Sequence, residues 1–388
     1  MKWLWLSFVL HGSAAPWPDS PATTTPVVMD QKTPVSWESL MPPEDLSGWK
    51  IVGGSATYRI EDSQLIGQSS AGSPNTWLVT ERNFGDFELE YEFLCDPSLN
   101  SGVQIRSEAN GAMARGFQVE IDVDDKRKRF WSAGLYEEGD RGWIDDLSDN
   151  PEARAAHKPH DWNHVRIVAV GAHLQTWLNG VPAAEVFDTR RLSGFIGLQV
   201  HGVGQRQDSP LEIRWRGLRV RDLGSHRWAL LNPPTDSGWV ETITLPEACS
   251  TFRIELTTEK DAPPVAIHWR KGAIRLEFST TSIDYSYSGE PSVDPSGNTV
   301  FGPIHTGRIG FRGRFQVFSG DLEKCSLVVN DGKERHLWEI PGPPRGGQIL
   351  LSGRRTRIRT IETLIPSDAL KKPREKAPED VAPKTTLR

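Results

Sequence analysis

The chain has 388 residues, enough for two or three domains, with ordinary shares of charged and hydrophobic residues. Its formal net charge of −6 offers no basic stripe for a phosphate backbone, so we do not expect a nucleic-acid partner. Tryptophan is abundant, with 15 residues against 5 of tyrosine. Two interpretations of these indoles stay open: flat surfaces on which sugar rings stack, or large fillers of β-sheet cores.

The first 15 residues have the pattern of a secretory signal peptide. Lys2 supplies a positive charge, residues 3–10 are mostly apolar, and small residues occupy 12–15. The apolar run is too short to span a bilayer, and no other run approaches that length. We therefore expect an exported protein, periplasmic or extracellular, without a membrane span. A fortuitously apolar start of the chain is the alternative.

Two further segments lack the pattern of a folded domain. Residues 16–36 are rich in Pro and Thr and predict an extended linker. Residues 366–388 mix Lys, Glu and Pro without apolar periodicity, and predict a disordered tail.

The three cysteines cannot all pair with one another. Cys95 lies on the apolar side of an alternating segment and is predicted to be a buried, unpaired thiol. Cys249 and Cys325 could form one disulfide if the protein is exported.

Alternation of apolar and polar residues dominates the chain between its two ends. Residues 87–93, 116–122 and 211–216 alternate almost without error, which predicts strands with one buried face. Asn179-Gly180 and Asp331-Gly332 are typical hairpin turns. The best short helix candidate is 150–156. Many short strands with few helices predict an all-β sandwich or jelly roll.

The second half of the chain repeats this pattern imperfectly. Residues 252–256 and 265–270 are similar to 87–91 and 102–106, and both halves end in an Arg-alternating strand. We therefore predict a second, degenerate β-sandwich over 226–365. The alternative is that any two sandwiches would align this well.

Three of the predicted strands each present a polar face. The even positions of 100–106 and 116–122 and the odd positions of 197–201 each share one side of their strand. Solvated outer faces usually carry Lys, Thr and Glu, and an ordinary solvated face remains the alternative here. Clustered amides, acids, Arg and His suit hydrogen bonding to a polyhydroxyl ligand. The candidates are Asn100, Gln104, Arg106, Gln118, Glu120, Asp122, Gln199 and His201.

The other motifs in the sequence give little evidence for a metal, calcium or nucleotide site. His157, His160 and His164 lie in a loop entering a strand, and their spacing matches no helical metal-binding pair. Residues 122–125 are acidic but lack the Gly and the distal Glu of a calcium loop, so a solvated turn is expected. The sequence contains no nucleophile elbow, phosphate loop or dinucleotide fingerprint.

Residues from about Trp37 to Leu223 resemble the 3-keto-disaccharide hydrolase domain family, long catalogued as a domain of unknown function. The resemblance rests on a set of blocks that occur in order with plausible spacing. They include Asp45–Trp49, Tyr58–Leu65, Phe84–Leu89, Asn100–Val103 with Arg106, Gly116–Asp122, Ala133–Tyr136, Asp161–Asn163, Trp177–Val181 and Gly194–Gly202. The resemblance implies a concanavalin/laminin-G-like jelly roll that acts on 3-keto-glycosides, with two such sandwiches in tandem if the second half has the same fold.

One departure from the family pattern concerns the candidate base. The family commonly has Glu-Val-Gln-Ile-x-Asp where this chain has Gln118-Val119-Glu120-Ile121-Asp122, so Glu and Gln have exchanged places on one face. The second half shows no convincing counterpart of this strand, so we expect no second active site there.

The implied reaction begins with a ketone at C3 of a sugar, which acidifies the proton on C2. A base removes that proton, the aglycone leaves from C1, and water addition completes a net hydrolysis. The route needs a carboxylate or imidazole base, a donor for the enolate oxygen and an acid for the leaving oxygen.

Candidate roles follow from these needs. We expect Glu120 or His201 as base or acid, Arg106 as oxyanion stabiliser, and Asp122 as an orienting group or metal ligand. The sequence indicates no definite cofactor, and a divalent cation could replace Arg106 as the electrophile. The paired-acid mechanism of ordinary glycosidases ranks lower, because Glu120 and Asp122 lie side by side on one strand. The expected substrate-binding residues are Gln104, Gln118, Gln199, Asn100 and Tyr136.

Two non-enzymatic functions compete with this hypothesis. Lectin-like sandwiches commonly bind carbohydrate without chemistry, so a carbohydrate-binding or cell-surface adhesion module is the main alternative. A structural role in a surface assembly is the other. For the enzyme and for the carbohydrate-binding module the expected ligand is a carbohydrate. The sequence indicates no particular protein partner.

Overall fold

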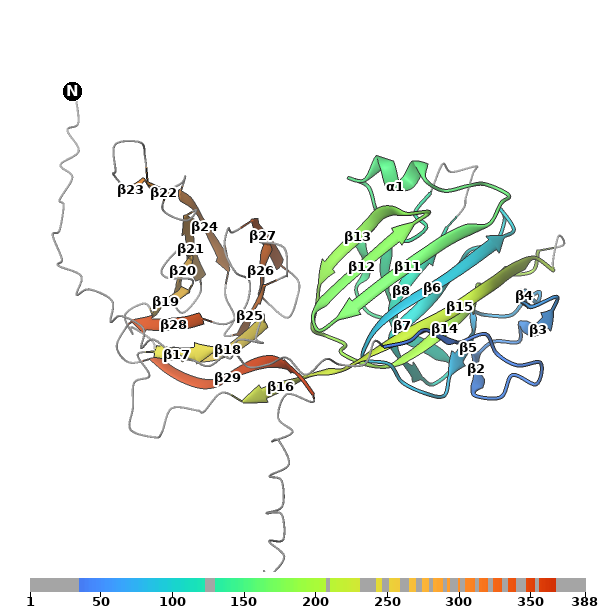
Figure 1. Cartoon of the computed structure of the whole chain (residues 1–388), viewed down its shortest axis with the longest axis horizontal. Helices are drawn as coiled ribbons and strands as arrows, with labels where there is room; N and C mark the ends of the chain where they lie inside the picture. The colour runs from blue at the N-terminus through green and yellow to red at the C-terminus, as the bar shows by residue number, and fades with distance from the viewer. Residues whose placement is uncertain are drawn as a thin grey trace, which may run out of the picture. The chain divides into compact units, whose positions relative to one another are not determined.

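A computed structural model describes residues 35–122, 130–206, 210–230 and 362–367 in full, and between 242 and 361 the backbone of the strands. Two antiparallel sheets build the part from residue 38 to residue 224. Figure 1 shows strands β13, β12, β11, β6 and β15 as a layer in front of β7, β8 and β14. The predicted all-β antiparallel sandwich is confirmed.

The first sheet has eight strands in the order β13-β12-β11-β6-β15-β4-β3, with β1 paired to β15. Its longest strands, β6 and β15, are those that the strict alternation of the sequence predicted. The strands are β1 (Glu38–Ser39), β3 (Thr57–Glu61), β4 (Gln64–Gln68), β6 (Asp86–Cys95), β11 (Asn163–Val170), β12 (His173–Leu178), β13 (Val181–Phe187) and β15 (Glu212–Gly224).

The second sheet has seven strands in the order β10-β9-β8-β7-β14-β5-β2. It contains all three strands whose polar faces the sequence singled out, and they are adjacent in the order β8-β7-β14. The strands are β2 (Trp49–Gly53), β5 (Thr76–Thr80), β7 (Ser101–Asn110), β8 (Met113–Ile121), β9 (Leu135–Glu138), β10 (Gly142–Asp145) and β14 (Phe195–Val200).

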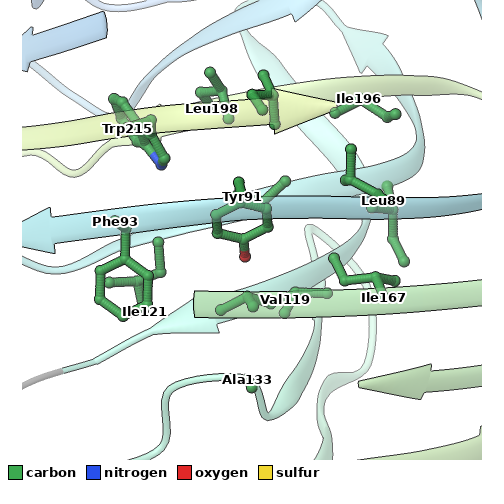
Figure 2. Close-up of a cluster of buried hydrophobic side chains, with 14 of the residues drawn as sticks. Leu89, Tyr91, Phe93, Val119, Ile121, Ala133, Ile167, Ile196, Leu198 and Trp215 are labelled. Carbon is green, nitrogen blue, oxygen red and sulfur yellow. The ribbon is translucent and has the colours of Figure 1, made fainter. Parts of the chain in front are cut away.

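The hydrophobic core lies between the two sheets. Figure 2 shows Tyr91 and Phe93 of β6 facing Val119 and Ile121 of β8, with Leu198 of β14 beside them. These residues occupy the apolar positions of the alternating segments, so every second residue of β8 and β14 is committed to the core. The intervening residues must therefore lie on the opposite side of the seven-stranded sheet.

The outer face of the eight-stranded sheet is a ladder of paired charges. Arg216 pairs with Glu92, and Arg219 pairs with Glu90 on the neighbouring strand. Tryptophan rings lie beneath several of the guanidinium groups, which explains part of the tryptophan content without a ligand. The stacked pairs are Arg216 on Trp162, Arg219 and Arg221 on Trp37, and Arg166 on Trp177.

Two local predictions are confirmed in the connections. The predicted helix is α1 (Pro151–Ala155), capped by Asn150, whose side-chain oxygen accepts from the backbone N–H of Ala153. Asn179 and Gly180 join β12 to β13 with φ of 51° and 84°, the left-handed values that a two-residue hairpin turn requires. No helix among the described residues is long and apolar enough to cross a membrane.

The second half contributes two six-stranded sheets and a two-stranded one. Their orders are β16-β29-β18-β25-β26-β27, β17-β28-β19-β20-β21-β24 and β22-β23. A second sandwich of the same class stays a prediction. The strands are β16 (His226–Leu230), β17 (Thr242–Leu245), β18 (Thr251–Thr258), β19 (Val265–Trp269), β20 (Ile274–Phe278), β21 (Ser282–Ser288), β22 (Ser292–Val293), β23 (Thr299–Val300), β24 (Ile304–Gly310), β25 (Arg314–Ser319), β26 (Lys324–Val329), β27 (Glu334–Glu339), β28 (Gly347–Ser352) and β29 (Thr356–Pro366).

The fate of the cysteine and terminal predictions differs. Cys95 is buried and unpaired, as predicted. Five other predictions concern residues whose side chains the structure does not describe. They are the Cys249–Cys325 disulfide, the signal peptide, almost all of the linker, the Asp331-Gly332 turn and nearly all of the tail.

Candidate functional site

A continuous polar face occupies the side of the seven-stranded sheet that is turned away from the core. We define the polar face as Asn100, Gln104, Gln118, Glu120, Asp122, Tyr136, Glu138 and Gln199. The register of the sheet aligns its members across strands: Tyr136 lies opposite Gln118, and Gln118 lies opposite Gln104. The prediction from even and odd positions along these strands (their parity) is thus confirmed for the amides and for Glu120.

Side-chain hydrogen bonds join the centre of the polar face into a chain that ends on Glu120. The Ser107 hydroxyl donates to Gln104 Oε1 at 2.7 Å, and Gln104 Nε2 donates to Gln118 Oε1 at 2.8 Å. Gln118 Nε2 then donates to one Glu120 oxygen at 3.0 Å, and Asn100 Nδ2 donates to the other at 2.6 Å. Every donor therefore points along the chain toward the carboxyl group, which favours a negative charge there.

Burial opposes that charge. Glu120 is only 5% exposed, and desolvation raises the pKa of its carboxyl group to about 7. The hydrogen bonds from Asn100 and Gln118 act in the other direction, while the nearby Asp122 and Glu138 raise the pKa further. The result is a carboxyl group that exchanges its proton near neutral pH.

Gly102 makes the amide chain possible. It lies directly opposite Glu120 on β7, and a β-carbon there would come within 2.5 Å of Cγ and Cδ of Gln118. Real side chains do not tolerate that distance, so only glycine lets Gln118 reach across to Gln104 and back to Glu120.

The polar face is enclosed rather than solvated. β2 lies close to β8, although three strands separate them in the sheet order, so the sheet is strongly curled. An apolar cluster consisting of Val52, Trp77, Val79, Ala114 and Phe195 lies on the same side of the sheet. Because Gln104, Gln118 and Gln199 are fully buried, the alternative of an ordinary solvated face is wrong.

The position of Arg106 differs from the one that the sequence predicted. The register shifts between Ile105 and Glu108, and Arg106 itself has a left-handed φ of 47°. This bulge brings Ser107 into hydrogen-bond contact with Gln104, the position that strict alternation assigned to Arg106.

The Arg106 guanidinium is fully buried and already occupied. Its Nε donates to the carbonyl of Gly85 at 2.7 Å, one terminal nitrogen donates to the carbonyl of Gly171 at 2.6 Å, and the other pairs with Asp86 at 3.1 Å. Gly85 and Gly171 adjoin strands of the other sheet. Arg106 therefore ties the two sheets together, and the prediction that it shares a site with Glu120 is wrong.

The remaining predicted residues lie at the edges of the polar face. His201 follows β14 directly, is half-buried, and donates from Nδ1 to the carbonyl of Gly202 at 2.8 Å. Asp122 follows β8 and is buried. Gln199 is completely buried on β14, where it lies opposite Trp77 of β5.

Two tryptophans at the β9–β10 side of the polar face, Trp131 and Trp143, were missed by the sequence reasoning. Trp143 lies opposite Tyr136, so the register carries the row Gln118–Tyr136 on to an indole. The Trp143 ring contacts Tyr136 at 5.3 Å and Trp131 at 4.8 Å, both edge to face. All three rings are half-buried. Spacing could not reveal them, because Trp131 and Trp143 are brought together only by the path of the chain around Gly134.

The pKa values of two side chains at this side of the polar face, Tyr136 and Glu138, are also raised. Burial raises the pKa of Tyr136 above its ordinary value, and the nearby Glu138 and Glu120 add to the effect. Burial likewise raises the pKa of Glu138, another residue that the sequence reasoning missed. Trp143 also lines an open bay of about 510 Å³. Its other lining residues are Ile144, Asp145, Asp146, Ser148, Asp149, Asn150 and Ala183.

The comparison with protein families decides what this domain resembles. Residues 36–221, which we call the lyase-like domain, match the model of the 3-keto-alpha-glucoside-1,2-lyase-like domain. The family resemblance predicted from the sequence blocks is thereby confirmed. The match indicates a glycosyl hydrolase-like or carbohydrate-binding function, and a carbohydrate ligand.

Several solved structures are similar to part of this chain. A candidate glycosyl hydrolase from Parabacteroides distasonis ATCC 8503 is 21% identical, covering 48% of this chain and 100% of that chain with a TM-score of 0.35. The carbohydrate-binding module CBM66 from Bacillus subtilis is 13% identical, covering 48% and 99% with a TM-score of 0.33. A Bacillus subtilis protein of unknown function with a galectin-like fold is 13% identical, covering 48% and 95% with a TM-score of 0.36. Comparison with curated proteins found no match.

The described residues of the lyase-like domain do not assemble a metal site. No group of three His, Cys, Asp or Glu side chains among them could hold a metal ion. His157 instead stacks between Phe93 and Phe130, and burial lowers its pKa to about 4. Residues 123–129, which follow Asp122, lie outside the described part of the chain.

Proposed function

We propose that the lyase-like domain cleaves 3-keto-glycosides by removing the C2 proton and eliminating the aglycone. The single observation that carries this proposal is the burial of the Glu120 carboxyl group, which is only 5% exposed. A general base works best when its pKa lies near the operating pH, and burial brings the pKa of this carboxyl group to about 7. At neutral pH a large share of Glu120 is deprotonated and still basic enough to take an acidified C–H proton.

The reaction balances with groups of the polar face. Glu120 takes the C2 proton, and the C–H electron pair forms an enolate with the C3 carbonyl. The enolate collapses to a C1–C2 double bond as the bond from C1 to the aglycone oxygen breaks. Tyr136, which stays protonated because its pKa is raised, is a suitable O–H donor, and His201 is the second candidate acid. Water then adds across the double bond for net hydrolysis.

The experiment compares a 3-keto-disaccharide with the same disaccharide carrying a hydroxyl at C3. The wild-type protein is expected to release the aglycone only from the keto form. Glu120→Gln should lower kcat/KM by about 10²- to 10⁴-fold, the usual contribution of a general base. In wild type, kcat/KM should rise with pH through about 7, because the base must lose its proton. Turnover by Glu120→Gln at the wild-type rate would refute the assignment.

A non-catalytic carbohydrate-binding module is the second candidate, and one observation favours it. Both oxygens of Glu120 already accept hydrogen bonds from Asn100 and Gln118, and the residue is almost enclosed. A structural carboxylate in a polar network would look the same. Saturable binding of a 3-keto-disaccharide without product, and without exchange of its C2 proton for deuterium, would decide for the binding module.

A further inference from the structure

The elimination proposed above needs a donor for the enolate oxygen, and the burial of Arg106 leaves that role vacant. Two other donors on the same side of the sheet satisfy the chemical need. Trp77 Nε1 and Gln199 Nε2 are both buried N–H groups without a hydrogen-bond partner among the residues that the structure describes. A buried, unpaired donor costs about 1–3 kcal/mol, so two of them side by side call for an explanation.

The register places the two donors together. Gln199 of β14 lies directly opposite Trp77 of β5, and the exposed fractions of the two residues are 0% and 1%. Directly opposed side chains have β-carbons about 4.5–5.5 Å apart. Both side chains face away from the core, because Leu198 and Leu78, their chain neighbours, belong to it.

The six-membered ring of the Trp77 indole packs toward β2. A β-carbon on Gly53 of β2 would meet Cε3 and Cζ3 of Trp77, each at 3.1 Å. The six-membered ring of the indole is therefore turned toward β2.

The donors and Glu120 belong to one row of the sheet. Glu120 lies opposite Gly102, and the register Leu198–Val103 continues to place Gln199 beside Gly102. The row therefore runs Glu120, Gly102, Gln199, Trp77 across four adjacent strands. The base and Gln199 are two strands apart, roughly 10 Å between backbones. Gly102 lies between them, with the Gln118 side chain over it.

We infer that Trp77 Nε1 and Gln199 Nε2 form an oxyanion hole that binds the C3 oxygen of a 3-keto sugar while Glu120 removes the C2 proton. The inference rests on the proposed function. Preorganised N–H donors in a water-excluded site stabilise a developing oxyanion strongly, and they have no competing partner to release first. Indole is a donor only, which suits a carbonyl or enolate oxygen and does not suit a hydroxyl proton.

The test removes each donor and keeps an aromatic ring at 77 and an unbranched side chain of similar length at 199. Trp77→Phe and Gln199→Met are each expected to lower kcat for a 3-keto-disaccharide by about 10²-fold with little change in KM, the range found for loss of one oxyanion donor. Gln199→Glu should be slower still, because its carboxylate repels the enolate. Trp215→Phe is the matched control, since its Nε1 is also buried without a described partner but belongs to the core between the sheets.

Exchange of the C2 proton in D₂O, followed by NMR, supplies a readout that does not depend on the leaving group. Both variants should slow exchange as much as turnover, and Trp215→Phe should leave both rates unchanged. Wild-type exchange rates in folded Trp77→Phe and Gln199→Met would overturn the oxyanion hole and leave the proposed function standing. If Trp77→Phe does not fold, the two Gln199 variants decide. Absence of exchange and turnover in the wild type would overturn the proposed function, and the oxyanion hole with it.

Discussion

Asp86 holds Arg106 with one carboxylate oxygen and His226 with the other. Arg106 donates to Oδ1 at 3.1 Å, His226 donates from Nδ1 to Oδ2, and the backbone N–H of Gly171 also donates to Oδ1 at 2.8 Å. Asp86 begins β6 and His226 begins β16, so one buried carboxylate ties β7 to two further strands. Both charges of this ion pair are almost completely buried.

The first prediction is that Arg106 acts on stability and not on chemistry. Arg106→Met leaves Asp86 as a buried charge with fewer donors, and breaking a buried pair in this way costs about 3–5 kcal/mol. Urea unfolding of the full chain should show this loss. Arg219→Met is the control: its pair with Glu90 is exposed on the outer face of the other sheet, and such pairs contribute at most about 1 kcal/mol. An Arg106→Met protein as stable as the control variant would contradict the prediction.

Sequence alternation predicted the strands and most of the polar face, for a physical reason. When the apolar residues of a strand face the core, the alternating residues between them must face the opposite side of the sheet. Gln118, Glu120 and Gln199 were therefore placed correctly. Arg106 was not, because a bulge depends on partners elsewhere. The carbonyls of Gly85 and Gly171, which accept hydrogen bonds from the Arg106 guanidinium, come from segments distant in sequence.

The enclosure of the polar face could not be predicted from the sequence either. Parity shows which side of a strand a residue occupies, but the curl of a sheet decides whether that side meets water. Val52 and Trp77 of β2 and β5 belong to the same apolar cluster as Ala114 of β8, and no local pattern predicts that approach. Several tryptophans that suggested sugar binding lie instead beneath guanidinium groups, as Trp37 and Trp177 do.

The second prediction concerns the pH dependence of stability. The pKa of Glu120 is about 7 in the folded protein and 4.5 as its ordinary value, so the folded state binds this proton more tightly. The contribution to stability is fully present below pH 4.5 and is lost as the pH rises through about 7. A difference of this size corresponds to roughly 3 kcal/mol.

Glu120→Gln should remove that contribution. The free energy of unfolding, measured between pH 4.5 and pH 8, is expected to fall more steeply in the wild type than in the variant. Glu92→Gln, which removes a half-exposed carboxylate on the other sheet, should leave the slope as it is in the wild type. Parallel curves for wild type and Glu120→Gln would show that the carboxyl group titrates normally.

The third prediction is a coupling between Gly102 and Gln118. A methyl group at 102 would come within 2.5 Å of the Gln118 side chain, so Gly102→Ala should cost about 1–3 kcal/mol by overpacking. The same substitution in a Gln118→Ala background has room for its methyl group and should cost much less. A double-mutant cycle from urea unfolding measures the difference. Equal costs in both backgrounds would mean that Gly102 is needed for its backbone and not for the path of Gln118.

The fourth prediction is that Trp143 contributes binding without contributing chemistry. Its ring continues the row from Gln118 and Tyr136, is half-buried, and lines the open bay. A sugar ring stacked there would be held equally in the ground and transition states, so Trp143→Ala should raise KM with little change in kcat. We expect about a tenfold increase, which corresponds to about 1.4 kcal/mol.

Trp177→Ala is the matched control for this prediction. Its ring is also half-buried, but it lies on the outer face of the other sheet, with the guanidinium of Arg166 stacked on it at 4.5 Å. Steady-state kinetics on a 3-keto-disaccharide should leave KM of this variant at the wild-type value. Equal increases in KM for the two variants would point to a general loss of stability. A fall in kcat confined to Trp143→Ala would move the ring from the binding of the aglycone to the positioning of Tyr136, whose phenol it contacts edge to face.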